Sequence, residues 1–428
     1  MDRMKLAIIC HFSTSQIRGQ LDLVDGSLCE YKDFGLWNVN IINGLKNRDD
    51  IELHVIAPHK GMRHATQEFK YEGVSYHFFR RDLPYPWAQL EHYLCPQNRR
   101  AYPRNRKRVK AFIEKIKPDL VNLIGAENPY YSITALDVED IPIIIHCQTV
   151  YANPDRIKNT GKMDQYRWDT EIKLFHKTPY IACNGRMYYD LIKQYAPESI
   201  IFPRRWPSPQ FPEIPEVEKK YDFVFFARAL SKNKGFDNAV EAMGQFVKIH
   251  SGATFLAIGK KDHDWPIYER RIKELGIEGS VITHDSITSY EEMLKFVRQG
   301  RFSLLPLTMD VVSGTILESM RMGMPVITCR TSGTPSLNEK RKTVLISEIG
   351  DSKGLCQNMV SLYESPELQE ELRHNAILFI KEKDELNSHN IDIMVKQYQA
   401  IIAHYNRRTP IPEELLYNTE ESIDYRNK

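Results

Sequence analysis

The sequence lacks the features that would place the chain in a membrane or in a disulfide-bonded class. Its 7 cysteines are scattered, and no Cys-x-x-Cys pair occurs. An odd number of thiols without that spacing argues against a disulfide framework and against a structural zinc site. The longest apolar runs have the length of a strand, well below the roughly 18 residues that a membrane helix needs. No secretory signal sequence is recognisable, so we expect a cytoplasmic protein.

Two common nucleotide-binding signatures are also missing. No Gly-x-Gly-x-x-Gly follows the first apolar run, which argues against a dehydrogenase of that type, and no P-loop sequence occurs. The net charge is only +2, from 58 basic and 56 acidic residues. Because domains that bind nucleic acid are usually far more basic, we expect no nucleic-acid partner.

The sequence does contain a repeated alternation of short apolar runs and amphipathic segments over its 428 residues. That length exceeds one ordinary core, and the alternation is typical of α/β domains with parallel sheets. The expected strands of the first half are Lys5–Cys10, Glu52–Ala57, Val74–Phe79, Leu120–Ile124, Ile143–His146 and Tyr180–Cys183. Those of the second half are Phe223–Ala227, Thr254–Ile258, Val281–His284, Phe302–Pro306, Pro325–Thr328 and Val344–Ile346.

A proline-rich stretch from Phe202 to Glu216 separates the two halves. Proline at this density continues neither a helix nor a central strand. We therefore predict an N-terminal Rossmann-like domain over residues 1–205, a linker over 206–220, a C-terminal Rossmann-like domain over 221–385, and a return helix with a tail over 386–428. The expected helices include Phe34–Lys46, Pro103–Lys117, Phe236–Ile249, Pro366–Lys381 and Ile391–Tyr405.

Two cations follow the first strand of the second half. Arg228 comes directly after Phe223–Ala227, and Lys234 precedes Gly235 at the start of the next helix. Cations at a strand end beside a helix N-terminus can bind a diphosphate. The alternative is a solvated loop with ordinary basic residues.

A second segment follows the strand Phe302–Pro306. The triplet Ser313-Gly314-Thr315 opens a helix, and its glycine would let a phosphate approach the free backbone N–H groups. Glu318 lies one turn inside that helix among apolar residues, where a carboxylate needs a hydroxyl or amide partner. The alternative is a first-turn glutamate stabilised by the helix dipole.

In their order along the chain, these segments resemble the retaining GT-B glycosyltransferases of family 4, also described as glycosyl transferases group 1. The resemblance lies in Phe225-Phe226-Ala227-Arg228, Lys234-Gly235, Asp310 and Glu318 at the spacing of a Glu-x7-Glu motif, Gly323-Met324-Pro325-Val326, Ser332-Gly333-Thr334-Pro335 and Gly350-Asp351. It implies the GT-B fold, in which two Rossmann-like domains with parallel sheets face each other across an interdomain cleft.

The resemblance also implies roles for individual residues. Arg228 and Lys234 would bind the diphosphate of a UDP- or GDP-type sugar donor, and the backbone of Ser313, Gly314 and Thr315 would hold the same phosphates. Glu318 would bind the ribose hydroxyls. Asp310, where the family usually has Glu, would contact the donor sugar. No metal and no cofactor is expected, since the two cations supply the positive charge.

Two residues of the first half are also candidates. His146 ends an apolar strand where the family often carries a His-Asp pair near the transferred sugar; here Cys147 follows it. The resemblance makes His146 a catalytic candidate, and the alternative is a strand-end histidine satisfied by the backbone. Gly35, at the start of Phe34–Lys46, is a further candidate for approach to the phosphates.

The implied function is transfer of a sugar from a nucleotide sugar to a hydroxyl of a glycan or lipid-linked acceptor, with retention of configuration, in surface polysaccharide biosynthesis. One alternative is a non-catalytic GT-B subunit that partners another glycosyltransferase. Another is a different GT-B enzyme, such as a phosphorylase or a sugar-nucleotide epimerase. The sequence does not indicate an oligomeric state.

Two further clusters of charge have ordinary explanations. The basic run Arg99–Lys110 reads as the solvated face of a helix, and the alternative is a peripheral contact with the inner membrane surface or with a lipid pyrophosphate. The Asp-x-Asp spelling at 262–264 matches a metal motif that belongs to a different, single-domain fold, and chance is the better account.

Overall fold

The computed structural model describes residues 3–24, 33–81, 90, 93–94, 101–153, 164–208, 211–261, 263–285, 287, 289–309 and 311–420. The chain divides into two compact units. The described residues of unit 1 fall within Met1–Asn153, Met163–Gln210 and Asn387–Ser422, and those of unit 2 fall within Phe211–Leu386.

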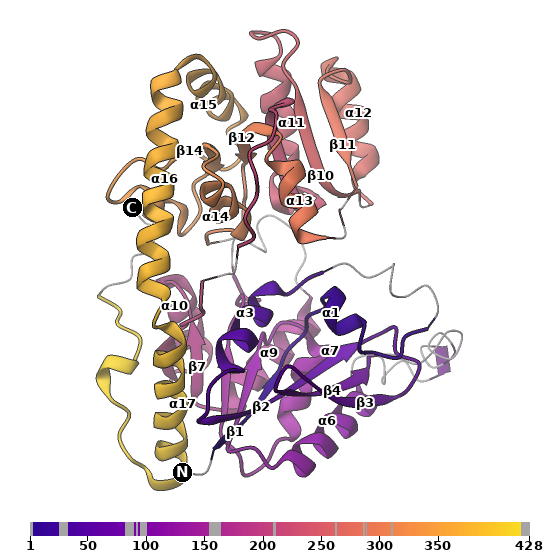
Figure 1. The fold of residues 1–428 in the computed structure, drawn as a ribbon, viewed down its shortest axis with the longest axis vertical. Helices are drawn as coiled ribbons and strands as arrows, with labels where there is room; N and C mark the ends of the chain where they lie inside the picture. Colours follow the sequence, from indigo (N-terminus) through magenta and orange to yellow (C-terminus); the bar gives the residue numbers. More distant parts are fainter. Residues whose placement is uncertain are drawn as a thin grey trace. The chain divides into compact units, whose positions relative to one another are not determined.

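Unit 1 is built on an eight-stranded sheet with the order β3-β4-β2-β1-β5-β6-β7-β8 (Figure 1). All neighbouring strands are parallel except β3 and β4, which pair antiparallel. The strands are β1 Met4–Ile9, β2 Ile51–His59, β3 Thr66–Tyr71, β4 Val74–Arg80, β5 Leu120–Ile124, β6 Ile143–His146, β7 Tyr180–Cys183 and β8 Ile200–Pro203.

The helices of unit 1 are amphipathic and cover this sheet. In α6 the stripe of Val109, Phe112, Ile113 and Ile116 is buried, and Pro103 occupies the first turn, where its missing N–H costs nothing. Gln165–Lys177 begins after Asp164, whose side chain accepts the Arg167 N–H. The helices are α1 Ser15–Arg18, α3 Leu36–Leu45, α6 Pro103–Ile116, α7 Pro129–Ser132, η1 Ile133–Asp137, α9 Gln165–Lys177, α10 Arg186–Tyr195, α17 Asn390–Arg407 and η4 Glu413–Leu415.

The helix α17 near the end of the chain belongs to the core of unit 1. Its residues Met394, Val395, Tyr398 and Ile401 are buried in the same cluster as the residues of β1, β2 and β5. The Tyr398 hydroxyl accepts a hydrogen bond of 2.8 Å from the Asn122 Nδ2 of β5. Packing and this buried bond fix α17 on the sheet of unit 1.

Unit 2 has a six-stranded, all-parallel sheet with the order β11-β10-β9-β12-β13-β14. Numbered from β9, this is the 3-2-1-4-5-6 order of the Rossmann fold. The strands are β9 Tyr221–Leu230, β10 Phe255–Lys261, β11 Val281–His284, β12 Gly300–Leu305, β13 Val326–Cys329 and β14 Val344–Ser347.

The helices of unit 2 alternate with its strands, and their ends follow local signals. Ser289 caps α13 by accepting the Glu292 N–H, and Asp351 caps α15 by accepting the Gly354 N–H. The helices are η2 Lys232–Lys234, α11 Phe236–Phe246, α12 Trp265–Leu275, α13 Tyr290–Val297, α14 Gly314–Arg321, η3 Thr334–Asn338, α15 Ser352–Glu364 and α16 Pro366–Asn387. The α16 residues Leu372, Ala376 and Ile380 are buried in the core of unit 2.

The predicted α/β class with two parallel sheets is confirmed, and each predicted strand is present with small changes at its ends. Two strands, β3 and β8, were not predicted. β3 is an edge strand of sequence Thr-Gln-Glu-Phe-Lys-Tyr, whose charged residues lower its apolar signal. β8 includes Phe202 and Pro203, which the proline criterion had placed in the separating stretch; the sheet accepts Pro203 because β8 lies at its edge.

We predict that Tyr398→Phe lowers the free energy of unfolding by about 1–3 kcal/mol, because the substitution leaves the Asn122 amide buried without its acceptor. Tyr405→Phe on the same helix is the matched control, since Tyr405 is exposed. Denaturant unfolding of both variants measures the difference, and equal losses would show that the buried bond contributes little.

Candidate functional site

The strand order of unit 2 defines where a ligand site is expected. Open α/β sheets bind ligands beyond the carboxyl ends of their strands, at the point where the strand order reverses. In unit 2 that point lies between β9 and β12, which are neighbours in the sheet. β9 leads into η2 and α11, and β12 leads into α14. The residues predicted from sequence therefore come from the two loops at this switch point.

Arg228 lies within strand β9, whereas we predicted that it follows the strand. β9 continues to Leu230, so Arg228 is part of the strand and does not follow it. Its pairing with β10 shifts register between Ile258 and Lys260. Arg228 is exposed and lies opposite this irregularity. Bulges of this kind re-aim a side chain, and they are frequent beside active sites.

Gly235 allows the loop after β9 to pack closely against the residue that follows β12. Its backbone has φ +75°, and a Cβ atom at this position would lie 1.8 Å from the carbonyl oxygen of Pro306. Only glycine allows so close an approach. Thr308 Oγ1 also donates a hydrogen bond of 3.0 Å to the carbonyl of Asn233. These two contacts hold Lys234 beside the segment that leads to α14.

The N-terminus of α14 presents free backbone donors at the same place. Ser313 precedes the helix in extended conformation and makes no side-chain capping bond; its hydroxyl lies 3.0 Å from Thr315 Oγ1. Gly314 is exposed, and the nearest atom to a Cβ built there is Glu318 Oε1, 4.0 Å away. A helix start without a capping side chain carries partial positive charge and can bind an anion.

Glu318 is half-buried and has a partner that sequence reasoning did not identify. The Tyr290 hydroxyl, at the start of α13, donates a hydrogen bond of 2.8 Å to Glu318 Oε1. Burial raises the pKa of Glu318 to about 6, and the bond from Tyr290 opposes that shift. The Glu318 carboxylate is thus held near Gly314, with a raised pKa and one fixed donor. No local sequence pattern marks Tyr290, because its contact depends on the packing of α13 against α14.

The loop after β13 supports this segment from the other side. Thr331 Oγ1 donates a hydrogen bond of 2.6 Å to the Val311 carbonyl. A Cβ at Gly333 would lie 2.4 Å from a Val311 methyl group, so Gly333 permits close packing of the two loops. The glycines of the Lys234-Gly235 and Ser332-Gly333 segments therefore serve the same purpose, which is close packing around the switch point. Asp310 lies outside the described residues.

His146 is placed differently from the residues of unit 2. It ends β6, and its side chain is 0% exposed. Its Nδ1 lies 2.7 Å from Asn122 Oδ1, and burial lowers the pKa of the ring to about 3, with a smaller contribution from Arg204. A neutral ring with no exposed surface has no access to a substrate in this conformation. The catalytic role of His146 stays a prediction that the geometry does not support.

Gly35 lies at the switch point of unit 1, between β1 and β5. It precedes α3 with φ +68°, and a Cβ there would lie 2.7 Å from the His11 carbonyl. Beside it, His11 Nδ1 contacts the hydroxyl of Tyr130 from the β5 side. Sequence reasoning identified Gly35 as a candidate but gave no role to His11 or Tyr130. His11 lies close to the end of the first strand. The predicted contact of Gly35 with phosphates stays a prediction.

The basic run is partly neutralised where the structure describes it. Arg106 forms an ion pair with Asp137, and Arg108 donates a hydrogen bond of 2.7 Å to the Arg80 carbonyl. Lys110 lies 4.0 Å from a carboxylate oxygen of Glu139, and Lys107 is exposed. Residues 99 and 100 lie outside the described residues. Within the described ranges, no helix is long and apolar enough to cross a membrane.

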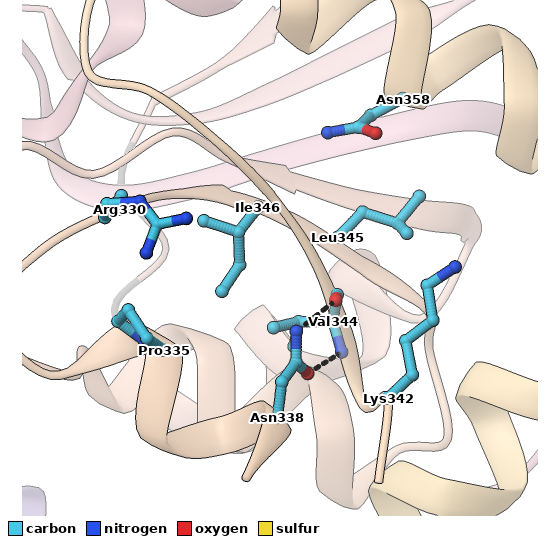
Figure 2. Close-up of a pocket in the computed structure, with 8 residues that line it drawn as sticks. All are labelled: Arg330, Pro335, Asn338, Lys342, Val344, Leu345, Ile346 and Asn358. Carbon is cyan, nitrogen blue, oxygen red and sulfur yellow. Dashed lines mark hydrogen bonds between the residues drawn. The ribbon is translucent and has the colours of Figure 1, made fainter. Parts of the chain in front are cut away.

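The described residues contain no group of three or more His, Cys, Asp or Glu side chains placed to hold a metal ion, and Asp262 is not among them. A cavity of about 370 Å³ lies at the edge strand β14, and Glu318 is not among the residues that line it. Figure 2 shows the lining residues. Arg330, Pro335, Asn338, Lys342, Val344, Leu345, Ile346 and Asn358 line it.

A family model matches the part of the chain that contains these two loops. Residues 220–365, from just before β9 to the end of α15, match the family model described as glycosyl transferases group 1. A comparison with curated proteins found no match. The family match therefore covers most of unit 2, including its switch-point segments, but not α16.

Solved structures share the fold at low sequence identity. Sucrose-phosphate synthase from Thermosynechococcus elongatus is 13% identical, with a TM-score of 0.70 over 94% of this chain and 100% of that chain. Anabaena Alr3699/HepE, in complex with UDP and glucose, is 14% identical, with a TM-score of 0.61 over 92% and 99%. An E. coli structure named trehalose-6-phosphate, bound with UDP-2-fluoro glucose, is 11% identical, with a TM-score of 0.62 over 92% and 99%. The chain has the α/β architecture of GT-B glycosyltransferase structures.

We predict that Gly235→Ala destabilises unit 2 by about 3 kcal/mol or more, because a left-handed backbone and a collision with the Pro306 carbonyl add together. Gly252→Ala is the matched control. Gly252 has φ +87° but no atom within 4 Å of a built Cβ, so its cost should be only about 1 kcal/mol. Thermal unfolding of both variants measures the loss of stability. Similar losses in the two variants would contradict the close packing of Gly235 against Pro306.

Proposed function

We propose that the protein is a retaining glycosyltransferase that moves a sugar from a UDP- or GDP-type nucleotide sugar to a hydroxyl of a glycan or lipid-linked acceptor. The nucleotide would bind at the switch point of unit 2. Support comes from the family match over residues 220–365 and from relatives in fold whose structures contain UDP or a UDP-sugar. The acceptor class, retention, family 4 and a place in surface polysaccharide biosynthesis follow from the resemblance of the motif series.

The observation that carries the proposal is that a half-buried carboxylate, a helix start without a capping side chain and a cation lie on the two loops where the strand order reverses. A nucleoside diphosphate needs donors for its phosphates and an acceptor for its ribose hydroxyls. The α14 N-terminus and Lys234 supply donors, and Glu318, one turn along α14, supplies the acceptor. A helix turn rises about 5.4 Å, which suits the separation of a diphosphate from its ribose.

The reaction needs charge stabilisation more than a nucleophile. As the bond between the anomeric carbon and the diphosphate oxygen breaks, negative charge develops on the leaving diphosphate. Arg228 and Lys234 would neutralise that charge, together with the N–H groups at the start of α14. The departing phosphate oxygen would then take the proton of the attacking acceptor hydroxyl on the same face of the sugar. The two cations would take the role that a metal ion has in other transferases.

Other residues and properties are also proposed. Asp310 is proposed to contact the donor sugar, and Gly35 the phosphates. A cytoplasmic location is proposed from the scattered cysteines and from the lack of a recognisable signal sequence, and peripheral contact with the membrane from the basic run Arg99–Lys110. We assign no cofactor and no metal. The catalytic role of His146 stays a prediction, because its ring is buried at the end of β6 and its Nδ1 lies 2.7 Å from Asn122 Oδ1.

Glu318→Ala should weaken UDP or GDP binding about tenfold or more, since a bond to a charged group contributes about 1.5–3 kcal/mol. In the native protein the affinity should fall as the pH drops through about 6, where the Glu318 carboxylate takes up a proton. Tyr290→Phe removes a bond that favours the ionised form, so this fall should move to higher pH, by roughly one unit.

Calorimetric titration between pH 5 and 8 measures these affinities. Tyr363→Phe is the control for Tyr290→Phe, because it removes a hydroxyl elsewhere in unit 2. An unchanged pH profile in Tyr290→Phe would contradict its role. Unchanged affinity in Glu318→Ala would contradict the nucleotide site itself.

Arg228→Ala and Lys234→Ala should each lower turnover of a nucleotide-sugar donor about 100-fold, the usual effect of losing one preorganised charge contact. Lys248→Ala is the control, because Lys248 is exposed after the opposite end of α11 and carries the same charge. Release of UDP or GDP from a donor panel is the assay. Full turnover in either of the first two variants would exclude that residue from catalysis.

A further inference from the structure

Arg228 lies in a part of β9 that is paired on one side only. On the β12 side, the pairing of β9 ends at Val224, which lies opposite Ser303. On the β10 side, the pairing continues to Leu230, which lies opposite Lys261. Within the part of the chain that the structure describes, the end of β9 that carries Arg228 is therefore held in the sheet by β10 alone.

The pairing of β9 with β10 changes register beside Arg228. The paired residues on the two sides of the change are Phe226 with Ile258 and Ala229 with Lys260. Two residues of β9, Ala227 and Arg228, thus lie opposite the single residue Gly259 of β10. This two-against-one arrangement is a β-bulge. Because side chains alternate between the two faces of a strand, one extra residue changes the direction of the side chains at and beyond it.

Gly259 leaves the space that the bulge occupies. It is buried, and a Cβ atom at its position would lie 2.7 Å from the Ala227 carbonyl oxygen and 3.3 Å from the Ala229 carbonyl carbon. Gly259 has no positive φ, so the close approach of the two backbones, and not its own conformation, requires a glycine here. A side chain at 259 would have to displace the backbone of β9 on both sides of Arg228.

The direction of the Arg228 side chain depends on this backbone. Arg228 is exposed, and among the described residues its side chain has neither an ion pair nor a hydrogen bond. No partner therefore holds the guanidinium in place, and the bulge decides on which side of the strand it starts.

We propose that Gly259 is a positioning residue that directs Arg228 by allowing the bulge in β9. The catalytic consequence rests on the proposed function, in which Arg228 contacts the donor diphosphate. Loss of the bulge would move the cation away from the leaving group without removing its charge, and charge stabilisation depends on that preorganised placement.

Crystal structures of Gly259→Ala and Gly300→Ala test the structural part of the proposal. Gly300 is the matched control, because it is also a buried strand glycine without a positive φ, and a Cβ there would lie 2.8 Å from a Val224 methyl group. It crowds the other end of β9, where it lies opposite Tyr221. The bulge and the direction of Arg228 should change in Gly259→Ala and stay native in Gly300→Ala. A native bulge with a native Arg228 in Gly259→Ala would overturn the proposal.

Release of UDP or GDP from the donor panel tests the catalytic part in a double-mutant cycle. Gly259→Ala should lower turnover about 10- to 100-fold, and it should cause little further loss in a protein that already carries Arg228→Ala. A merely structural loss would instead add to the loss from Arg228→Ala, and additive losses would overturn the positioning role. Gly300→Ala should keep native turnover.

A second variant tests the direction of the cation without crowding the bulge. The exchange of Arg228→Ala together with Ala229→Arg keeps Gly259 and moves the positive charge by one residue, to the other direction along the strand. It should lose as much turnover as Arg228→Ala alone, and full turnover would show that direction does not matter. Thermal unfolding verifies that each variant is folded. If the native protein releases no nucleotide from any donor, the proposed function fails, and the crystal structures still decide whether Gly259 directs Arg228.

Discussion

The close approach of Gly235 to the Pro306 carbonyl is the constraint on which the site of unit 2 depends. It joins the loop after β9 to the end of β12, the two strands between which the strand order reverses. Lys234 directly precedes the contact, and the segment that begins at Pro306 ends at the start of α14. Without a glycine at 235 the loops would separate, and the cation would no longer be fixed beside the free N–H groups of Gly314 and its neighbours.

The raised pKa of Glu318 makes the folded state less stable as the pH rises. The folded protein holds this carboxyl with a pKa of about 6, above its ordinary value of 4.5. The folded state therefore binds the proton more tightly than the unfolded chain, so this group lowers the free energy of unfolding as the pH rises through that interval. A neutral glutamine would avoid this cost. The carboxylate of Glu318 accepts one hydrogen bond, from the Tyr290 hydroxyl. Such a group fits a site in which a ligand supplies further hydroxyl donors.

The sequence predicted the strands of both sheets because buried parallel strands form continuous apolar runs, as in Phe223–Ala227. It also placed Lys234, Ser313–Thr315 and Glu318 on the two loops at the switch point, since parallel strands and their following helices bring these loops to one edge; their binding roles stay predictions. It missed β3, whose alternating polar residues resemble a loop, and Tyr290, whose contact with Glu318 arises from packing between two helices. For His146, the position at a strand end was right, but the direction of its side chain toward Asn122 depends on α17, more than 240 residues later.

A crystal structure of the protein with UDP or GDP bound tests the central claim most directly. The account predicts that the diphosphate lies at the N-terminus of α14 within contact of Lys234, and that a ribose hydroxyl donates a hydrogen bond to Glu318. A nucleotide that binds at the β14 edge or elsewhere, with Glu318 still bonded only to Tyr290, would contradict it.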